Sequence, residues 1–138
     1  MKRRAFVSLT VTGACAYAAS GCTSADDPGP LDADVVLELA DYEDLGDEGG
    51  WVALPTEVTD YSERIFVERL ANDEFRALSA FCNHEGCNVD RVGGGYSCPC
   101  HGSEFSGAGK LQRGPATRGL RRFNTAYDAK ANTVTLLA

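Results

Sequence analysis

The chain has 138 residues, which is enough for one domain of ordinary size behind a short N-terminal segment. Its apolar and charged fractions, 43% and 24%, are ordinary for a globular protein and exclude composition-driven disorder and a multi-span membrane protein. The formal net charge of −7 argues against nucleic acid as a partner, because phosphate binding needs clustered lysine and arginine on a basic domain.

Residues 1–22 have the order of an export signal. Three basic residues precede an apolar stretch, and small residues follow up to Cys22. A transmembrane helix needs about 20 strongly apolar residues, and this stretch is shorter and rich in Ser, Thr, Gly and Ala, so a retained span is the weaker interpretation. Arg3 and Arg4 resemble a twin-arginine signal, and an ordinary basic signal region is the alternative.

Cys22 is a candidate for lipidation. The residues before it resemble a lipobox, although Ala19 stands where a large aliphatic residue is usual. A free exposed thiol outside the cell is chemically awkward, which favours lipidation over simple cleavage nearby. The acidic residues 23–33, with Pro-Gly-Pro near their middle, predict a flexible linker.

From residue 34 onward, apolar residues come in short runs bounded by turn formers, a pattern typical of β-strands. The predicted strands cover residues 35–39, 51–54, 64–70, 75–81, 120–126 and 133–137. Asn72 and Asp73 suit a hairpin turn. No segment keeps a helical period over the length of an interior helix. Residues 34–138 are therefore predicted to form a small all-β sandwich or barrel with Gly-rich loops at one end.

Two short boxes combine cysteine with histidine. They read C-N-H-E-G-C over residues 82–87 and C-P-C-H-G-S over residues 98–103, and both histidines of the chain lie within them. Such a cluster predicts a metal site, and two cysteines with two histidines could hold zinc. Zinc would leave Cys87 and Cys100 unexplained. The four candidate ligands are Cys82, His84, Cys98 and His101.

With these boxes the sequence resembles the Rieske iron–sulfur proteins, in the branch found in quinol-oxidising cytochrome bc complexes. The resemblance covers about residues 78–116. It implies a Rieske-like sandwich or barrel with a two-loop subdomain that binds one [2Fe–2S] cluster. Cys82 and Cys98 would bind the buried iron, and His84 and His101 the outer one.

The resemblance also assigns roles around the ligands. It implies a disulfide between Cys87 and Cys100, which suits an exported protein because disulfides persist in oxidising compartments. Ser103 would donate a hydrogen bond to a cluster sulfur. The loop containing Gly114 and Pro115 would cover the cluster on a third side. Two imidazole ligands in place of thiolates give potentials of about −150 to +300 mV.

The chain departs from the usual pattern of this branch. Glu85 stands where a leucine shields the cluster, and Phe105 stands where a tyrosine gives a second hydrogen bond. Both changes favour the oxidised cluster and predict a lower potential than that of a ubiquinol-oxidising member. Thr117 stands where a second proline is usual. The interval between the boxes is also short, and a long N-terminal membrane helix is missing or replaced by a lipid.

The sequence thus predicts an exported electron-transfer protein at a periplasmic or other extracytoplasmic face, held at the membrane by a lipid or an N-terminal anchor. Two roles stay open. The chain would relay electrons from a quinol or a cytochrome b partner to a c-type cytochrome, as a subunit of an oxidoreductase. Alternatively, it would be the small subunit of another exported redox enzyme, such as an arsenite-oxidase-like molybdenum enzyme. By itself it would be an electron carrier.

Charge is unevenly distributed along the chain. Acidic residues gather at positions 41–48, and arginines gather around the proline-containing segment. Two solvated faces are one interpretation, and a basic rim near the cluster that steers an acidic partner is the other. The arginines are Arg113, Arg118, Arg121 and Arg122.

Overall fold

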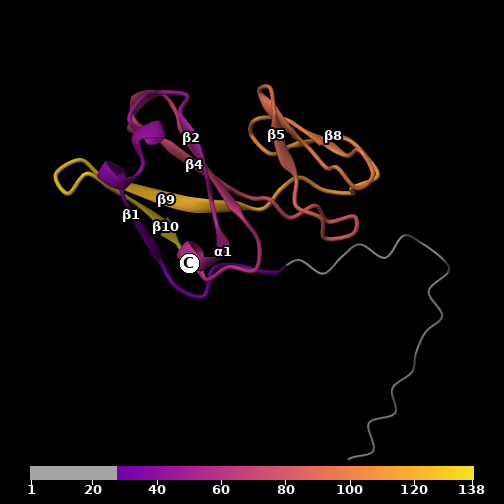
Figure 1. Ribbon diagram of the computed structural model, residues 1–138, viewed down its shortest axis with the longest axis horizontal. Coiled ribbons are helices and arrows are strands. Elements are labelled where there is room, and N and C mark those ends of the chain that lie inside the picture. Colours follow the sequence, from indigo (N-terminus) through magenta and orange to yellow (C-terminus); the bar gives the residue numbers. More distant parts are fainter. Residues whose placement is uncertain (1–27) are drawn as a thin grey trace, which may run out of the picture.

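Figure 1 shows a computed structural model of the chain, which describes residues 28–138. The predicted export segment with Cys22, and the first part of the predicted linker, lie outside the described residues. Among residues 28–138, no helix has both the length and the hydropathy of a membrane span.

The larger part of the fold is a curled antiparallel sheet of six strands in the order β1-β10-β9-β4-β3-β2. All six predicted strands are present, with ends displaced by at most two residues, and the predicted all-β class is confirmed. Their bounds are β1 (Val35–Glu38), β2 (Trp51–Leu54), β3 (Ile65–Arg69), β4 (Phe75–Ser79), β9 (Arg122–Asp128) and β10 (Thr133–Leu137).

Strands β3 and β4 are joined by a short hairpin turn. Asn72 and Asp73 both have φ of 58°, the left-handed conformation that a tight hairpin between β3 and β4 requires, so the predicted turn is confirmed. Asn and Asp adopt this conformation more readily than most residues. The helical segments are α1 (Thr56–Thr59) and the 3-10 turns η1 (Leu39–Asp41), η2 (Glu43–Leu45) and η3 (Ala71–Asp73).

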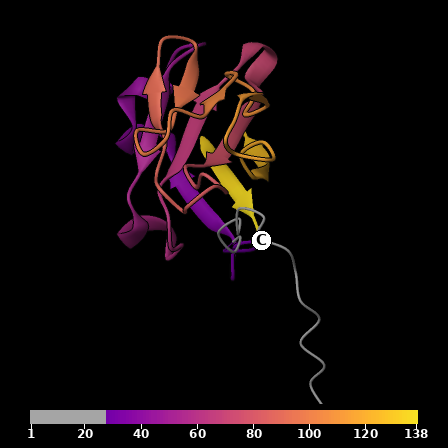
Figure 2. The same ribbon diagram turned by 90° about the vertical axis from the view of Figure 1, so that its right-hand side faces the viewer.

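A second sheet of four very short strands is inserted between β4 and β9, in the order β5-β6-β7-β8. It lies beside the large sheet in Figure 1 and faces the viewer in Figure 2. A Cβ atom on Gly95 would lie 2.5 Å from the carbonyl oxygen of Phe105, so the close approach of β6 and β7 requires glycine there. The bounds are β5 (Asp90–Val92), β6 (Gly95–Ser97), β7 (Glu104–Phe105) and β8 (Leu111–Arg113).

The buried apolar residues form two clusters, and the second contains residues of both sheets. One lies within the six-stranded sheet and includes Leu37, Ile65 and Val134. The other extends under the small sheet and contains Cys82 and Cys98 together with aromatic and aliphatic side chains. The second cluster therefore places two of the candidate ligands inside a hydrophobic core.

The described end of the predicted linker lies against the large sheet. Leu31 is buried in the first cluster, and the Tyr61 hydroxyl donates to the carbonyl oxygen of Gly29 over 2.8 Å. The linker prediction did not anticipate these contacts. A single apolar residue in an acidic, proline-containing segment gives no periodic signal, so its burial is visible only in the fold.

A charged network joins the two sheets. Glu68 on β3 accepts from Arg76 on β4 over 3.2 Å and from Arg91 on β5 over 2.9 Å. Arg76 also donates to the carbonyl oxygen of Gly107, and Arg91 to the hydroxyl of Tyr96. All three charged side chains are less than one-fifth exposed. The network therefore fixes the small sheet against the large one, and with it the loops that carry the two boxes.

Candidate metal centre

The first box forms a loop that closes on itself. The N–H of Cys82 donates to the carbonyl of Cys87, and the N–H of Gly86 donates back to the carbonyl of Cys82, both over 2.9 Å. Gly86 has φ of 78°, which few residues other than glycine adopt without strain. A bridge between Phe81 and Asn88 ties the base of the loop. These hydrogen bonds fix the backbone of the loop, and with it the positions from which the side chains at 83–86 extend.

The second box repeats this hydrogen-bond frame. The N–H of Cys98 donates to the carbonyl of Ser103 over 2.8 Å, and the N–H of Gly102 donates to the carbonyl of Cys98 over 2.9 Å. Gly102 has the same φ as its counterpart in the first loop, 78°. Both loops therefore start with a buried cysteine and turn back through a glycine four residues later.

Two thiols from the two loops meet in the second hydrophobic cluster. Cys82 and Cys98 are free and buried, with exposures of 0% and 3%. Burial raises the pKa of the Cys82 thiol, and a hydrogen bond from the backbone N–H of His84 opposes this shift. Cys98 lies close enough to raise the pKa of the Cys82 thiol further. A bound cation would favour the thiolate form, which is the metal ligand.

The two imidazoles lie together on the outer side of the loops. The rings of His84 and His101 are edge to face, with centroids 4.7 Å apart. Nδ1 of His84 is buried and has no hydrogen-bond partner among the described residues. Nδ1 of His101 lies 3.6 Å from a carboxylate oxygen of Glu85. A buried ring nitrogen without a partner is costly in an apoprotein, and a metal ion would satisfy it.

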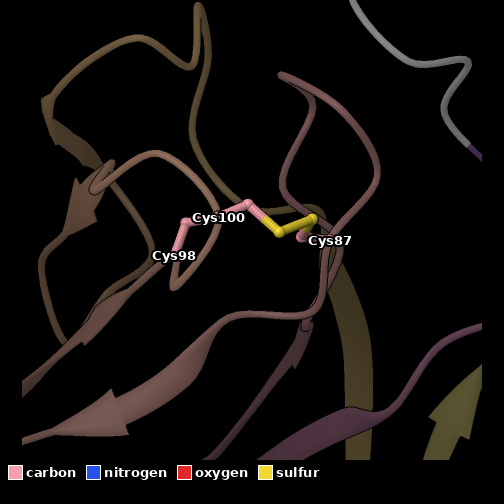
Figure 3. Close-up of side chains that lie close together, drawn as sticks. All are labelled: Cys87, Cys98 and Cys100. Carbon is pink, nitrogen blue, oxygen red and sulfur yellow. A yellow bond between two sulfur atoms is a disulfide. The ribbon is translucent and has the colours of Figure 1, made fainter.

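Cys87 and Cys100 form a disulfide that joins the two loops, as Figure 3 shows. The sulfur atoms of Cys87, Cys98 and Cys100 lie within 4.8 Å of one another. The disulfide removes its two sulfurs from the possible thiolate ligands, so among residues 28–138 the free thiols are those of the buried Cys82 and Cys98. The disulfide implied by the sequence is confirmed.

A third segment, residues 114–117, is hydrogen-bonded to both boxes. The N–H of Ala116 donates to Oγ of the buried Ser103 over 2.9 Å. Gly114 and Pro115, joined by a cis peptide bond, are exposed. Phe105, with 1% exposure, belongs to the same buried cluster as the two free thiols.

Asn83 and Thr117 also belong to this environment, although no role for either was predicted from the sequence. Asn83 lies between two candidate ligands and is 4% exposed. Its amide exchanges two hydrogen bonds with Thr117, a residue 34 positions later in the chain. Two features of the sequence could have pointed to this contact. A polar residue stands between Cys82 and His84, and the usual proline is absent at position 117.

Three of the four arginines considered for a basic rim lie together at this end of the molecule. Arg118, Arg121 and Arg122 line a surface hollow together with Phe81 and Asn83 of the first loop. Arg113 instead lies 3.7 Å from Glu104 in an exposed ion pair. Positive charge therefore lies beside the first box, on a chain whose net charge is negative.

The residues present fit a metal group with two sulfur and two nitrogen ligands. Two buried thiols converge from the two loops, and two imidazoles lie nearer the surface, one of them with an unpartnered ring nitrogen. This donor set alone suits both zinc and a mixed-ligand iron–sulfur cluster. The comparisons with known proteins distinguish the two.

The model of the Rieske [2Fe-2S] domain family matches residues 36–124. The chain is 40% identical over 57 residues to the mitochondrial cytochrome b-c1 complex Rieske subunit of Bos taurus. It is 41% identical over 68 residues to the ubiquinol-cytochrome c reductase iron-sulfur subunit of Rhodobacter capsulatus. These matches cover 39% and 36% of this chain, and 21% and 36% of the respective relatives, so the chain matches only part of their length.

Among solved structures, the cyanobacterial plasma membrane Rieske protein PetC3 from Synechocystis PCC 6803 superposes with a TM-score of 0.54 and 29% identity. The match covers 70% of this chain and 94% of that one. Naphthalene 1,2-dioxygenase, at 18% identity and a TM-score of 0.57, matches 78% of this chain and 26% of its own. The second likeness concerns the fold alone.

Proposed function

Since the chain belongs to the Rieske [2Fe–2S] domain family and binds a [2Fe–2S] cluster, we propose that it is an exported electron-transfer protein. Its relation to the Rieske subunits of cytochrome bc complexes supports this role. The cluster, when bound, supplies one-electron transfer at a potential tuned by its ligands and their surroundings. The proposed ligands are Cys82 and Cys98 on one iron and His84 and His101 on the other.

The observation that carries this assignment is the unequal burial of the four side chains. Cys82 and Cys98 lie in the hydrophobic cluster, whereas the side chain of His101 is 43% exposed. Buried thiolates suit the iron that is held inside the protein. The exposed imidazole is the point at which a redox partner approaches, because electron transfer needs a short path to the surface.

The disulfide bond supports the proposal of export. The Cys87–Cys100 disulfide suits an oxidising compartment, since thiols stay reduced in most cytosolic proteins. We extend the proposal to residues 1–22, which would direct the chain outward, and to Cys22, which would carry a lipid that holds it at the membrane. The domain would then face a periplasmic or other extracytoplasmic space.

For the partners we propose a quinol or quinol-oxidising cytochrome b as donor and a c-type cytochrome as acceptor. The relatives named above are subunits of cytochrome complexes, which favours this pair over a molybdenum enzyme. Glu85, whose carboxylate lies beside the exposed imidazole, would lower the potential and suit a low-potential quinol. The arginines beside the first loop would steer an acidic partner.

The composition of the purified protein tests the cluster and its ligands. We expect two irons and two acid-labile sulfides per chain, and a reduced-state paramagnetic signal typical of histidine-ligated clusters. Changing His84 or His101 to Ala should abolish that signal. Stoichiometric zinc without iron would contradict the proposal.

Stopped-flow measurements test the proposed partners. Oxidised protein is mixed with a low-potential quinol, and the reduced protein with a soluble c-type cytochrome, at increasing salt concentration. We expect reduction in the first experiment and oxidation that slows with salt in the second. Electron transfer that is independent of salt would contradict steering by the arginines.

A further inference from the structure

Consecutive peptide N–H groups fasten the segment at residues 114–117 to both ligand loops. The N–H of Ala116 donates to Oγ of Ser103, in the second loop, over 2.9 Å. The N–H of Thr117 donates to Oδ1 of Asn83, in the first loop, over 3.2 Å. Nδ2 of Asn83 donates back to the Thr117 hydroxyl over 2.9 Å. The disulfide joins the loops covalently, and this segment joins them by hydrogen bonds.

The Asn83–Thr117 pair depends on the chemistry of both residues. An asparagine amide offers an acceptor and a donor, and threonine meets them with its peptide N–H and its hydroxyl oxygen. Aspartate at 83 would lack the donor, and valine at 117 would lack the hydroxyl. Asn83 is 4% exposed whereas Thr117 is exposed, so the cost of breaking the pair falls mainly on the buried amide, because an unsatisfied buried amide group is costly.

The fastened segment packs against the proposed thiolate ligands through Ala116. Ala116 is 4% exposed and belongs to the same buried cluster as Cys82 and Cys98. Asn83 is covalently flanked by Cys82 and His84, so its position fixes the backbone between two proposed ligands. If the pair is broken, the segment loosens and water gains access to the thiolates.

We propose that Asn83 and Thr117 are positioning residues that hold the segment at 114–117 closed over the [2Fe–2S] site. They act through Ala116 and through the backbone at His84, without binding metal themselves. The inference rests on the proposed ligand set and is independent of export and of the electron-transfer partners.

The test compares holoprotein variants N83A, T117V and the double variant. Cluster loss is followed as the decay of visible absorbance in the presence of an iron chelator, and the reduced-state paramagnetic spectrum is recorded for each. We expect each single variant to lose its cluster about tenfold faster, which corresponds to about 1.4 kcal/mol, and to show a broadened spectrum. The double variant should lose it no faster than the faster single variant, because the residues act as a pair.

Two further variants separate positioning from general stability. T117S keeps both the N–H and the hydroxyl, and it should restore the wild-type rate and spectrum. T125V removes a comparable hydroxyl bond, the one of 2.9 Å from Thr125 to the carbonyl of Phe75 between β9 and β4. It should lower the unfolding temperature and leave the rate of cluster loss and the spectrum unchanged.

The proposal is overturned if N83A and T117V lose their clusters at the wild-type rate, if their effects multiply in the double variant, or if T125V accelerates loss as strongly. A wild-type protein with zinc in place of the cluster would overturn the proposed function itself. The two failures are thus distinguishable by the metal content of the wild-type protein.

Discussion

The carboxylate of Glu85 lies 3.6 Å from Nδ1 of His101 at the exposed tip of the ligand loops. Both side chains are partly open to solvent, with exposures of 57% for Glu85 and 43% for His101. The chain therefore presents negative charge at the place where a partner would meet the outer iron. At the proposed ligand His101, this charge would stabilise the oxidised, more positive cluster and weaken docking to an apolar surface.

Glu85→Gln should raise the reduction potential, because it removes that charge while keeping the shape of the side chain. Exposed charge pairs contribute about 0.2–1 kcal/mol, and for one electron about 1.4 kcal/mol corresponds to 59 mV, so the expected rise is about 10–40 mV. Protein-film voltammetry at low salt measures it. The control is Glu57→Gln on α1, also exposed, which should leave the potential unchanged. Equal shifts for both variants would mean that only net charge matters.

Phe105→Tyr should raise the potential by some tens of millivolts. The ring is 1% exposed and shares a buried cluster with Cys82 and Cys98. An added hydroxyl would therefore meet either a sulfur atom or apolar side chains of the cluster. A hydrogen bond to sulfur stabilises the reduced cluster, and a neutral one contributes about 0.5–1.5 kcal/mol. An unchanged or lowered midpoint with an intact cluster would show that the ring edge points away from it.

Ser103→Ala is the counterpart of this change and should lower the potential by a similar amount. Oγ of Ser103 accepts the N–H of Ala116, which leaves the hydroxyl hydrogen available for a sulfur atom. Removing the hydroxyl also leaves that N–H without its acceptor. Voltammetry of the two variants together checks the direction of both shifts.

Replacing both Cys87 and Cys100 by Ser should leave the four proposed ligands in place and loosen the loops. The bridge spans 13 residues, and cross-links of this size contribute about 2–4 kcal/mol to stability. Denaturant unfolding of the apoprotein and the rate of cluster loss should both register the change. Alkylation and mass spectrometry of the native protein should find neither residue as a free thiol, and two alkylated thiols at these positions would contradict the bridge.

Glu68→Gln should destabilise the chain by about 3 kcal/mol, because it leaves Arg76 and Arg91 without their shared counter-charge in a largely buried place. The matched control is Asp73→Asn, which breaks the Arg69–Asp73 pair, whose aspartate is 61% exposed. That change should cost no more than about 1 kcal/mol. Urea unfolding measures both, and equal losses would mean that the network contributes as little as a surface pair.

The long strands were predictable because their residues alternate or run apolar over enough positions to give a period, as in Ile65–Arg69. The small sheet was not, since strands of two or three residues such as Glu104–Phe105 carry no period. Their pairing depends on tertiary conditions, including the lack of a side chain at Gly95 where it meets Phe105.

The candidate ligands were predictable because cysteine and histidine are rare and occur here in two compact boxes. The polar contacts around them were not. Asn83 meets Thr117 across 34 positions, and Arg91 meets Glu68 across 23, and neither pair belongs to a motif. Such residues look like ordinary surface polar residues until the fold brings them together.

The two ligand loops share one pattern of short-range backbone hydrogen bonds, and this pattern bears on how the cofactor is acquired. Each loop is closed by hydrogen bonds that span at most six residues, from Cys82 to Cys87 and from Cys98 to Ser103. Contacts so local form rapidly and cost little chain entropy. An arriving cluster therefore meets two half-sites that are already shaped, and the entropy lost on insertion is small. Preorganisation of this kind lets a short chain capture its cofactor without first ordering a long loop.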